Sequence, residues 1–119
     1  MDATDARLEH ETLDVYWIAL DLHALVWRLL PKRGVRVLRD QLERSSMSVV
    51  LNIAEGAGRR SAPDKRRFYE MARGSAMESA ALIDILRVRN IVPTPACADA
   101  RKLTVRAVQM LSRLVGPVR

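Results

Sequence analysis

The chain has 119 residues, which suits one domain (1–119), and its 49% hydrophobic and 29% charged residues are typical of a globular protein, not a disordered one. Its first residues are acidic, so we expect no secretory signal, and no apolar run approaches the roughly 20 residues that a transmembrane helix needs. A lone Cys97 excludes an intramolecular disulfide and a cysteine metal cage. These features predict a cytoplasmic protein that makes no contact with a membrane.

The net charge of +6 is unevenly distributed along the chain. Residues 1–27 contain six acidic side chains and one basic one, whereas residues 28–119 contain nineteen basic and eight acidic ones. Such asymmetry predicts a basic surface that could meet phosphate or an acidic partner. The alternative is that the arginine content reflects genomic composition, since seventeen of the twenty basic residues are Arg.

A first helix is predicted over residues 12–30, after an acidic N-terminal extension of residues 1–11. Its polar residues Asp14, Asp21 and Arg28 are seven apart and form one narrow stripe. Almost every other position is apolar, so we expect this helix to be buried on more than one side. A lone four-helix bundle buries one face of each helix, and the apolar surplus therefore predicts an oligomer interface.

A second helix is predicted over residues 35–57, where glycines provide stop signals. One line along it carries short polar side chains and almost no charge, namely Gln41, Ser45, Ser48, Asn52 and Glu55. This line is either a solvent-exposed face or a buried or interfacial hydrogen-bond network that fixes helix register. In the second case the partners of Asn52 and Glu55 come from the set Arg44, Arg59, Arg73 and Glu78.

A third helix is predicted over residues 62–89, with a Ser61 cap at its start. We expect its core face to consist of Phe68, Met71, Ser75, Ser79, Leu82, Ile85 and Leu86. A proline-containing loop over residues 92–95 precedes a fourth helix over residues 98–115. Its outward positions are Arg101, Lys102, Arg106, Gln109 and Arg113. Because the loops are short, we predict an all-α, antiparallel, up-down-up-down four-helix bundle.

The sequence offers little for catalysis. His10 and His23 have no ligand spacing between them, so no metal site is expected. No nucleophile motif or phosphate-binding P-loop is present. Glu55 and Glu78 could form a carboxylate pair, but structural acids that pair with Arg are the favoured interpretation. We therefore predict a non-catalytic protein without a cofactor, a metal or a small-molecule substrate.

The best candidate for a binding site lies where the second helix gives way to the third. This cluster, which we call the basic hinge, consists of Arg59, Arg60, Lys65, Arg66, Arg67 and Arg73. Arginine suits phosphate because its planar fork makes bidentate hydrogen bonds, and Tyr69 could be an exposed ring on which a base stacks. The alternative is a solvated helix start, with Phe68 and perhaps Tyr69 in the core. The skewed charge of the chain is the reason to keep the nucleic-acid hypothesis.

Two sequence motifs lie on either side of this hinge. The first is the run Asn52-Ile-Ala-Glu-Gly56 followed by Gly58-Arg59, and the second is Ala72-Arg73-Gly74-Ser75 followed by Glu78. At this spacing they resemble the four-helix bundle family named after the 23S rRNA intervening-sequence protein, over residues 15–92. By this resemblance the motif positions are Asn52, Glu55, Gly56, Arg73, Gly74, Ser75 and Glu78. Together with Gln41 and Arg44, they are expected to hold the bundle and its oligomer together.

The resemblance implies a bacterial bundle that assembles as a ring-like homopentamer. Related bundles include the accessory variability determinant of diversity-generating retroelements, which partners a reverse transcriptase and binds nucleic acid through a basic surface. Two functions follow as expectations. The first is an oligomeric scaffold that binds the phosphate of RNA or DNA through the basic hinge. The alternative is a protein-interaction adaptor, such as an accessory subunit of a reverse transcriptase. The acidic N-terminal extension departs from the family's pattern.

Overall fold

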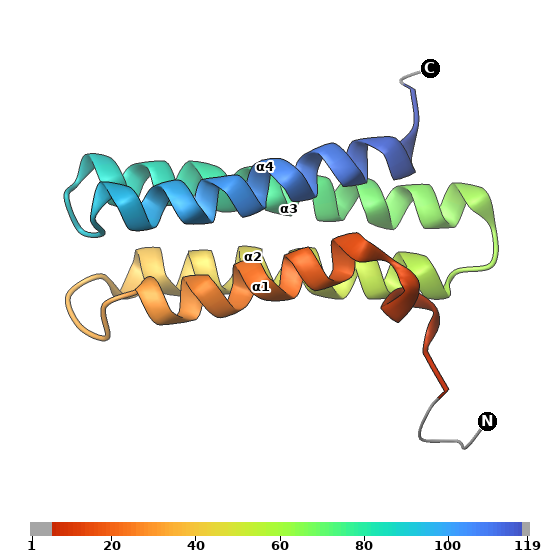
Figure 1. The fold of residues 1–119 in the computed structure, drawn as a ribbon, viewed down its shortest axis with the longest axis horizontal. Helices are drawn as coiled ribbons and strands as arrows, with labels where there is room; N and C mark the ends of the chain where they lie inside the picture. The colour runs from red at the N-terminus through yellow and green to blue at the C-terminus, as the bar shows by residue number, and fades with distance from the viewer. Residues whose placement is uncertain (1–5, 118–119) are drawn as a thin grey trace.

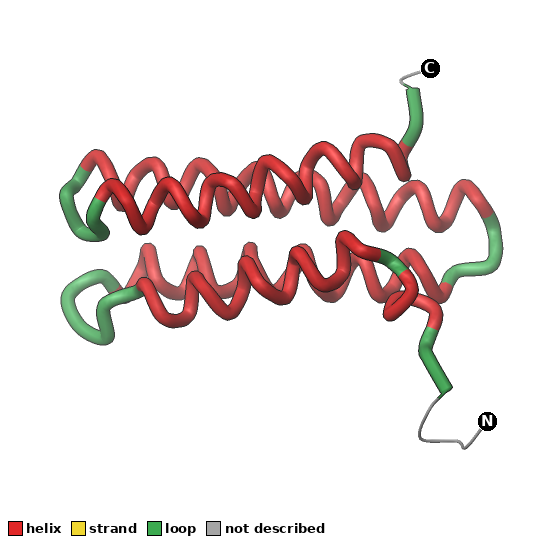
Figure 2. The backbone as a smooth tube through the Cα atoms, viewed as in Figure 1, coloured by secondary structure: helices red, strands yellow, loops and turns green. Residues whose placement is uncertain are grey.

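The computed structural model describes residues 6–117, and this part of the chain is all-α, with four helices, one 3₁₀ turn and no β-strand (Figures 1 and 2). The elements are η2 (Glu9–Thr12), α1 (Asp14–Leu29), α2 (Arg36–Gly58), α3 (Ala62–Val88) and α4 (Thr94–Val115). α2 packs against α3, α3 against α4, and α1 against both α2 and α4. Figure 1 shows the α2–α3 turn at one end of the molecule and the other two interhelical loops at the opposite end.

The helix bounds differ most from the sequence prediction at the fourth helix. The first three helices begin and end within two residues of the predicted positions, but α4 begins at Thr94 and not at residue 98. Pro95 lies in the first turn of α4, where its missing N–H removes no intrahelical hydrogen bond, so the proline-containing segment starts the helix. Part of the acidic extension is also regular, because Glu9–Thr12 forms η2, whereas residues 1–5 lie outside the described residues.

The buried core has two parts along the helix axes. The part beside the α2–α3 turn is formed by Val15, Ile18, Ala19, Val49, Val50, Ile53, Tyr69, Ala72, Ala76, Ala107 and Leu111. The part toward the other end is formed by Leu22, Val26, Leu30, Leu42, Leu82, Ile83, Leu86, Val92, Cys97 and Ala100. These side chains hold all four helices, so the helix ends that carry the basic hinge rest on a packed support.

The buried face of α3 includes the predicted Ser79, Leu82 and Leu86 but is otherwise turned toward Tyr69, Ala72, Ala76 and Ile83. Met71 and Ile85, which were expected in the core, are 49% and 39% exposed, while Tyr69 and Ala72 are buried. α2 and α3 approach each other through small side chains, and the buried hydroxyls of Ser45 and Ser79 bond to each other at 2.8 Å. Larger side chains at these positions would separate the helices.

Part of the apolar surplus lies on the surface of the chain. Trp17 and Trp27 on α1 are 47% and 65% exposed, and Met47 and Leu51 on α2 are 46% and 59% exposed. Single exposed apolar residues are common, but two tryptophans and a row on α2 exceed what one packed core uses. Within residues 6–117 no helix is both long enough and apolar enough to cross a membrane.

Candidate nucleic-acid interface

The turn of the basic hinge is three residues long, because α2 ends at Gly58 and α3 begins at Ala62. The Ser61 hydroxyl accepts a hydrogen bond from the backbone N–H of Asp64 at 3.2 Å, as the predicted cap requires. Behind the turn, α2 and α3 meet at Gly56, where an added Cβ would lie 2.8 Å from a ring carbon of Tyr69. Only glycine lets the Tyr69 ring lie against the α2 backbone in this way.

The two aromatic rings of the hinge have different environments. Tyr69 is 6% exposed and belongs to the core, so the prediction that it is an exposed stacking ring is wrong. Burial raises the pKa of its phenol above the ordinary value, and the nearby Glu9 carboxylate raises it further. Phe68 is half-buried, and the guanidinium groups of Arg59 and Arg67 lie 4.7 Å and 4.9 Å from its ring centroid. Phe68 therefore fixes two arginines by cation–π contacts and is not free for a base.

Several hinge cations are used within the chain. The Lys65 ammonium donates to the carbonyl of Ala57 at 2.8 Å and to that of Gly56 at 3.4 Å, so it caps the C-terminal end of α2. Arg59 forms an ion pair with Glu55 one turn earlier on the chain. These contacts reduce the positive charge that the turn presents to a partner.

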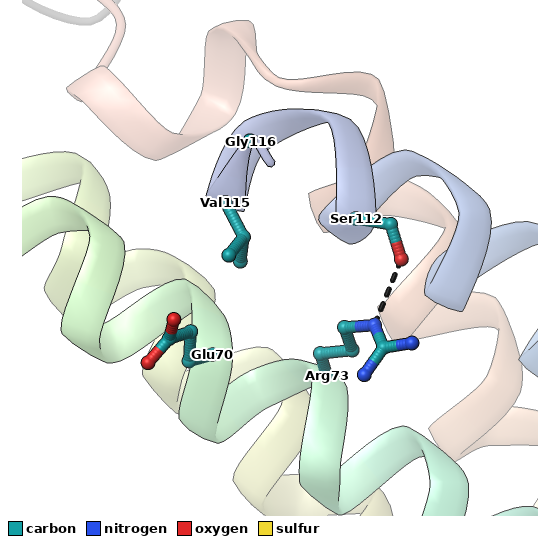
Figure 3. Close-up of a pocket in the computed structure, with 5 residues that line it drawn as sticks. All are labelled: Glu70, Arg73, Ser112, Val115 and Gly116. Atoms are coloured by element: carbon teal, nitrogen blue, oxygen red, sulfur yellow. Dashed lines mark hydrogen bonds between the residues drawn. The ribbon is translucent and has the colours of Figure 1, made fainter. Parts of the chain in front are cut away.

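Arg66 and Arg73 both reach toward the end of α4. The Arg66 guanidinium donates to the carbonyl of Pro117 at 2.7 Å and lies 3.6 Å from the carboxylate of Glu70. Arg73 Nε donates to the hydroxyl of Ser112 at 2.8 Å (Figure 3). A hollow of about 360 Å³ separates α3 from α4 here, and it is lined by Glu70, Arg73, Ser112, Val115 and Gly116 (Figure 3). Arg73 therefore ties α3 to α4, and Arg66 ties α3 to the segment that follows α4.

Arg60 and Arg67 are the hinge cations most available to a ligand. Both are exposed, and within residues 6–117 neither forms an ion pair with an acid. Arg60 follows the end of α2 and Arg67 lies on the second turn of α3. The hinge thus presents two open guanidinium groups, of which that of Arg67 lies over the Phe68 ring, and not the six cations that the sequence suggested.

The residue types expected for the other site classes do not cluster in the part of the chain that the structure describes. No group of three or more His, Cys, Asp or Glu side chains within residues 6–117 has the arrangement of a metal site. His23 Nδ1 lies 2.8 Å from the hydroxyl of Ser46, and His10 stacks edge-on against Tyr16. Each histidine is thus engaged in packing between helices or at a helix start.

A family model described as the 23S rRNA-intervening sequence protein matches residues 11–113. The chain belongs to this family. No curated protein matches the chain. A crystal structure at 1.70 Å resolution, of a protein with unknown function from the S23 ribosomal protein family of Bacteroides thetaiotaomicron VPI-5482, is similar with a TM-score of 0.79. The two chains are 17% identical, and the match covers 87% of this chain and 99% of that one, which shows a shared fold.

The motif of this 23S rRNA-intervening sequence family member joins α2 to α3. Asn52 Nδ2 donates to the carbonyl and the hydroxyl of Ser48, both at 2.9 Å, and Ser48 Oγ lies 2.8 Å from Ser75 Oγ. Asn52 thus works through two serines, and the expected contacts to Arg44, Arg73 or Glu78 are not present among the described residues. Of the expected arginine partners, Arg59 alone pairs with Glu55.

The remaining motif residues of this family member lie on the outer surface of α2 and α3. Gln41, Arg44, Gly74 and Glu78 are all exposed. A Cβ added at Gly74 would meet nothing within 4 Å. Glu55 and Glu78, considered above as a carboxylate pair, are also exposed, and Glu55 is instead paired with Arg59. No contact among residues 6–117 explains why these residue types occupy the exposed motif positions.

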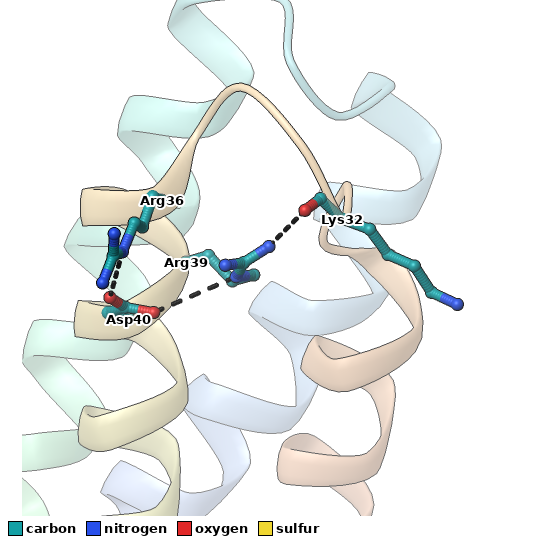
Figure 4. Close-up of polar contacts among 4 residues, drawn as sticks. All are labelled: Lys32, Arg36, Arg39 and Asp40. Atoms are coloured by element: carbon teal, nitrogen blue, oxygen red, sulfur yellow. Dashed lines mark hydrogen bonds and ion pairs between the residues drawn. The ribbon is translucent and has the colours of Figure 1, made fainter.

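A groove that the sequence did not predict lies between α1 and α2 at the opposite end of the molecule. It has a volume of about 390 Å³ and is lined by Trp27, Leu30, Lys32, Arg39, Asp40 and Glu43. Figure 4 shows Arg39 between the Lys32 carbonyl, to which it donates, and Asp40, which also lies 3.8 Å from Arg36. In the sequence, the only sign of this groove is Trp27, one of the many apolar residues of the first helix. The helix pattern does not show that α2 places charged residues beside Trp27.

Proposed function

We propose that this member of the 23S rRNA-intervening sequence protein family is a non-catalytic oligomeric scaffold that binds the phosphate backbone of RNA or DNA. The observation that carries the proposal is the pair of exposed, acid-free guanidinium groups of Arg60 and Arg67 at the basic hinge. Arginine forks bind phosphate by bidentate hydrogen bonds, and phosphate contacts alone support binding without sequence preference. A cytoplasmic location is part of the same proposal.

The test is a gel-shift panel of single- and double-stranded RNA and DNA at low salt, with the double variant R60E/R67E. We expect the wild-type protein to bind and the variant to bind at least about tenfold more weakly, because two phosphate contacts are replaced by repulsion. Arg59 and Arg66 are left intact because their contacts to Glu55 and Pro117 stabilise the hinge. Absence of binding to every nucleic acid would contradict the proposal.

The scaffold is proposed to self-associate as a ring-like homopentamer of up-down-up-down bundles. Support comes from the outer surface of α2 and α3, where Leu51 and Met71 are 59% and 49% exposed beside the uncharged Ser48–Asn52–Ser75 network. An apolar row around a satisfied polar centre is typical of a protein interface. The pentamer is the assembly implied by the family resemblance.

Light scattering tests this assembly. The wild-type protein is expected to have about five times the 13.4 kDa mass of one chain, and Leu51→Glu is expected to shift it toward the monomer. Val105→Glu is the control, because Val105 is 41% exposed on α4, away from the α2–α3 surface. A wild-type monomer at micromolar concentration, or equal dissociation of both variants, would contradict this assembly.

A second candidate function is that of a protein-interaction adaptor, for instance the accessory subunit of a reverse transcriptase related to the accessory variability determinant. The groove that carries Trp27 favours it, since a 65% exposed tryptophan beside Lys32, Arg39 and Glu43 has the composition of a binding hot spot. Trp27→Ala is expected to abolish co-purification with such a partner, with Trp17→Ala as the control. Co-purification that survives Trp27→Ala would reject this groove.

A further inference from the structure

A second group of basic residues lies on α4, apart from the hinge. We call it the α4 basic face; its members are Arg101, Lys102, Arg106 and Arg113, and all four are exposed. The opposite side of α4 is buried through Cys97, Ala100, Thr104, Ala107 and Leu111, so the helix cannot turn these cations inward. The basic side chains therefore project from a fixed support.

These cations are not neutralised within the described chain. The ion pairs of residues 6–117 involve Arg36, Arg39, Arg59 and Arg66, and none involves the α4 basic face. Acidic side chains around this face are Asp99 on the same helix, Asp14 of α1, which lines one hollow together with Arg113, and Glu70 of α3, which lines another with Ser112 and is paired with Arg66. Four exposed cations against the two acids that have no ion pair within residues 6–117 leave this face positive.

The spacing of the face suits a repeating row of phosphates. At about 1.5 Å per residue, Lys102, Arg106 and Arg113 span roughly 17 Å along the helix axis. A double helix carries about one phosphate charge per 1.7 Å of its axis, counting both strands, so roughly five phosphates of each strand lie within this length. The face is therefore long enough to contact several phosphates of one duplex at once.

The uncharged residues of this face identify the form of nucleic acid. A shallow groove of about 640 Å³ runs between the cations and is lined by Ala98, Arg101, Lys102, Val105, Arg106 and Gln109. None of these side chains is aromatic, whereas proteins that bind single strands usually stack the bases on aromatic rings. A double helix presents its phosphates outward and needs no stacking ring.

We infer that the α4 basic face binds the phosphate backbone of a nucleic-acid double helix, independently of sequence. The inference deepens the proposed function by naming a second surface and the duplex form, and it rests on the proposal that this protein binds nucleic acid. It does not require the hinge to be the contact site, because α4 is a separate helix from the two that carry the hinge.

The test measures fluorescence anisotropy of the full chain with a DNA duplex of about 20 base pairs, at salt concentrations from about 50 to 200 mM. The variant K102Q/R106Q/R113Q keeps side-chain length and removes three charges. The control R28Q/R33Q/R36Q removes three exposed charges from the α1–α2 end of the molecule. An RNA duplex and the DNA single strand of the same sequence serve as further probes.

We expect the α4 variant to bind the DNA duplex at least about tenfold more weakly at low salt. The slope of log affinity against log salt concentration should become shallower by about 2.7, or about 0.9 for each lost phosphate contact. The control should keep most of the affinity, and the wild-type protein should prefer both duplexes to the single strand. Similar binding to the DNA and RNA duplexes supports backbone recognition.

Three results would overturn the inference: unchanged duplex binding by the α4 variant, an equal loss in the control, or preference of the wild-type protein for the single strand. The hinge variant R60E/R67E separates the two proposals. If it abolishes binding while the α4 variant binds normally, the proposed function stands and the α4 basic face is rejected. If the reverse occurs, the α4 basic face is the contact site and the hinge is rejected.

Discussion

The basic hinge and the α4 basic face carry similar charge but use it differently. In the hinge, Lys65 caps α2, Arg66 holds the chain after α4, and Arg73 joins α3 to α4. The cations of the α4 basic face have no ion pair within residues 6–117. A dense cluster in the sequence therefore overstates the charge that is open to a ligand, while a dispersed set on one helix face understates it.

The difference follows from where each set lies on its helices. A helix end leaves carbonyl groups without intrahelical partners, and these attract cations such as Lys65. Arg101, Lys102 and Arg106 lie farther inside α4, where the backbone groups are paired within the helix and offer no free acceptor. Position at a helix end thus explains the role of Lys65, whereas Arg73 inside α3 is engaged by a side chain of the neighbouring helix.

The largest expected effect concerns the packing behind the hinge. Gly56→Ala places a methyl group 2.8 Å from the Tyr69 ring and 3.1 Å from Phe68 Cβ, so we expect a loss of about 1–3 kcal/mol in the free energy of unfolding. Urea denaturation measures it. Gly58→Ala is the control, because its added Cβ meets nothing within 4 Å, and equal stability of both variants would contradict a packed hinge.

A smaller effect is expected for the cap of α2. Lys65→Gln removes the charged donor to the Ala57 carbonyl and should lower the free energy of unfolding by about 1 kcal/mol. Arg67→Gln, at an exposed position in the same hinge, should change stability little and weaken nucleic-acid binding more. If thermal denaturation and anisotropy gave the reverse pattern, the division of the hinge into structural and open cations would be wrong.

Alkaline pH compares the two parts of the core, one of which contains Tyr69 and the other Cys97. Burial raises the pKa of the Cys97 thiol above its ordinary value of 9.0, with a partial offset from Arg87, so the folded state keeps a proton that the unfolded state loses. The contribution of the buried Cys97 thiol to the free energy of unfolding is therefore fully present below about pH 9. It is lost as the pH rises through the thiol's pKa in the folded state. Tyr69 adds a second fall above pH 10, its ordinary pKa.

Urea midpoints measured from pH 8 to 11 test this expectation. Cys97→Ala should remove the fall that begins near pH 9 and leave the later one, which Tyr69→Phe should remove. A wild-type midpoint that stays constant or increases over this range would contradict the buried, protonated state of both groups.

The smallest stability effect is expected on the α4 basic face. Arg106→Gln should change the free energy of unfolding by no more than about 0.5 kcal/mol, because the side chain is exposed and has no ion pair within the described residues. Ser112→Ala, one turn from the end of the same helix, should cost more because it leaves Arg73 Nε without its partner. Equal thermal stability of the two variants would contradict the expectation that Ser112 stabilises the fold and Arg106 does not.

The sequence by itself determined the features that depend on residues close together along the chain. Helix periodicity, the Ser61 cap and the short turns placed three helices within two residues, and the paired motifs identified the family. The outward direction of Arg106 and Arg113 on α4 was also predicted, because it follows from the periodicity of one helix.

Only the tertiary structure decided which of two apolar stripes on α3 is buried and which cations remain open. Tyr69 lies in the core because Gly56 of α2 leaves space for its ring, whereas Met71 is exposed. Arg73 is engaged because Ser112, 39 residues away, lies opposite it. Such pairings join distant parts of the chain, and the local periodicity of one helix carries no information about its neighbour's side chains.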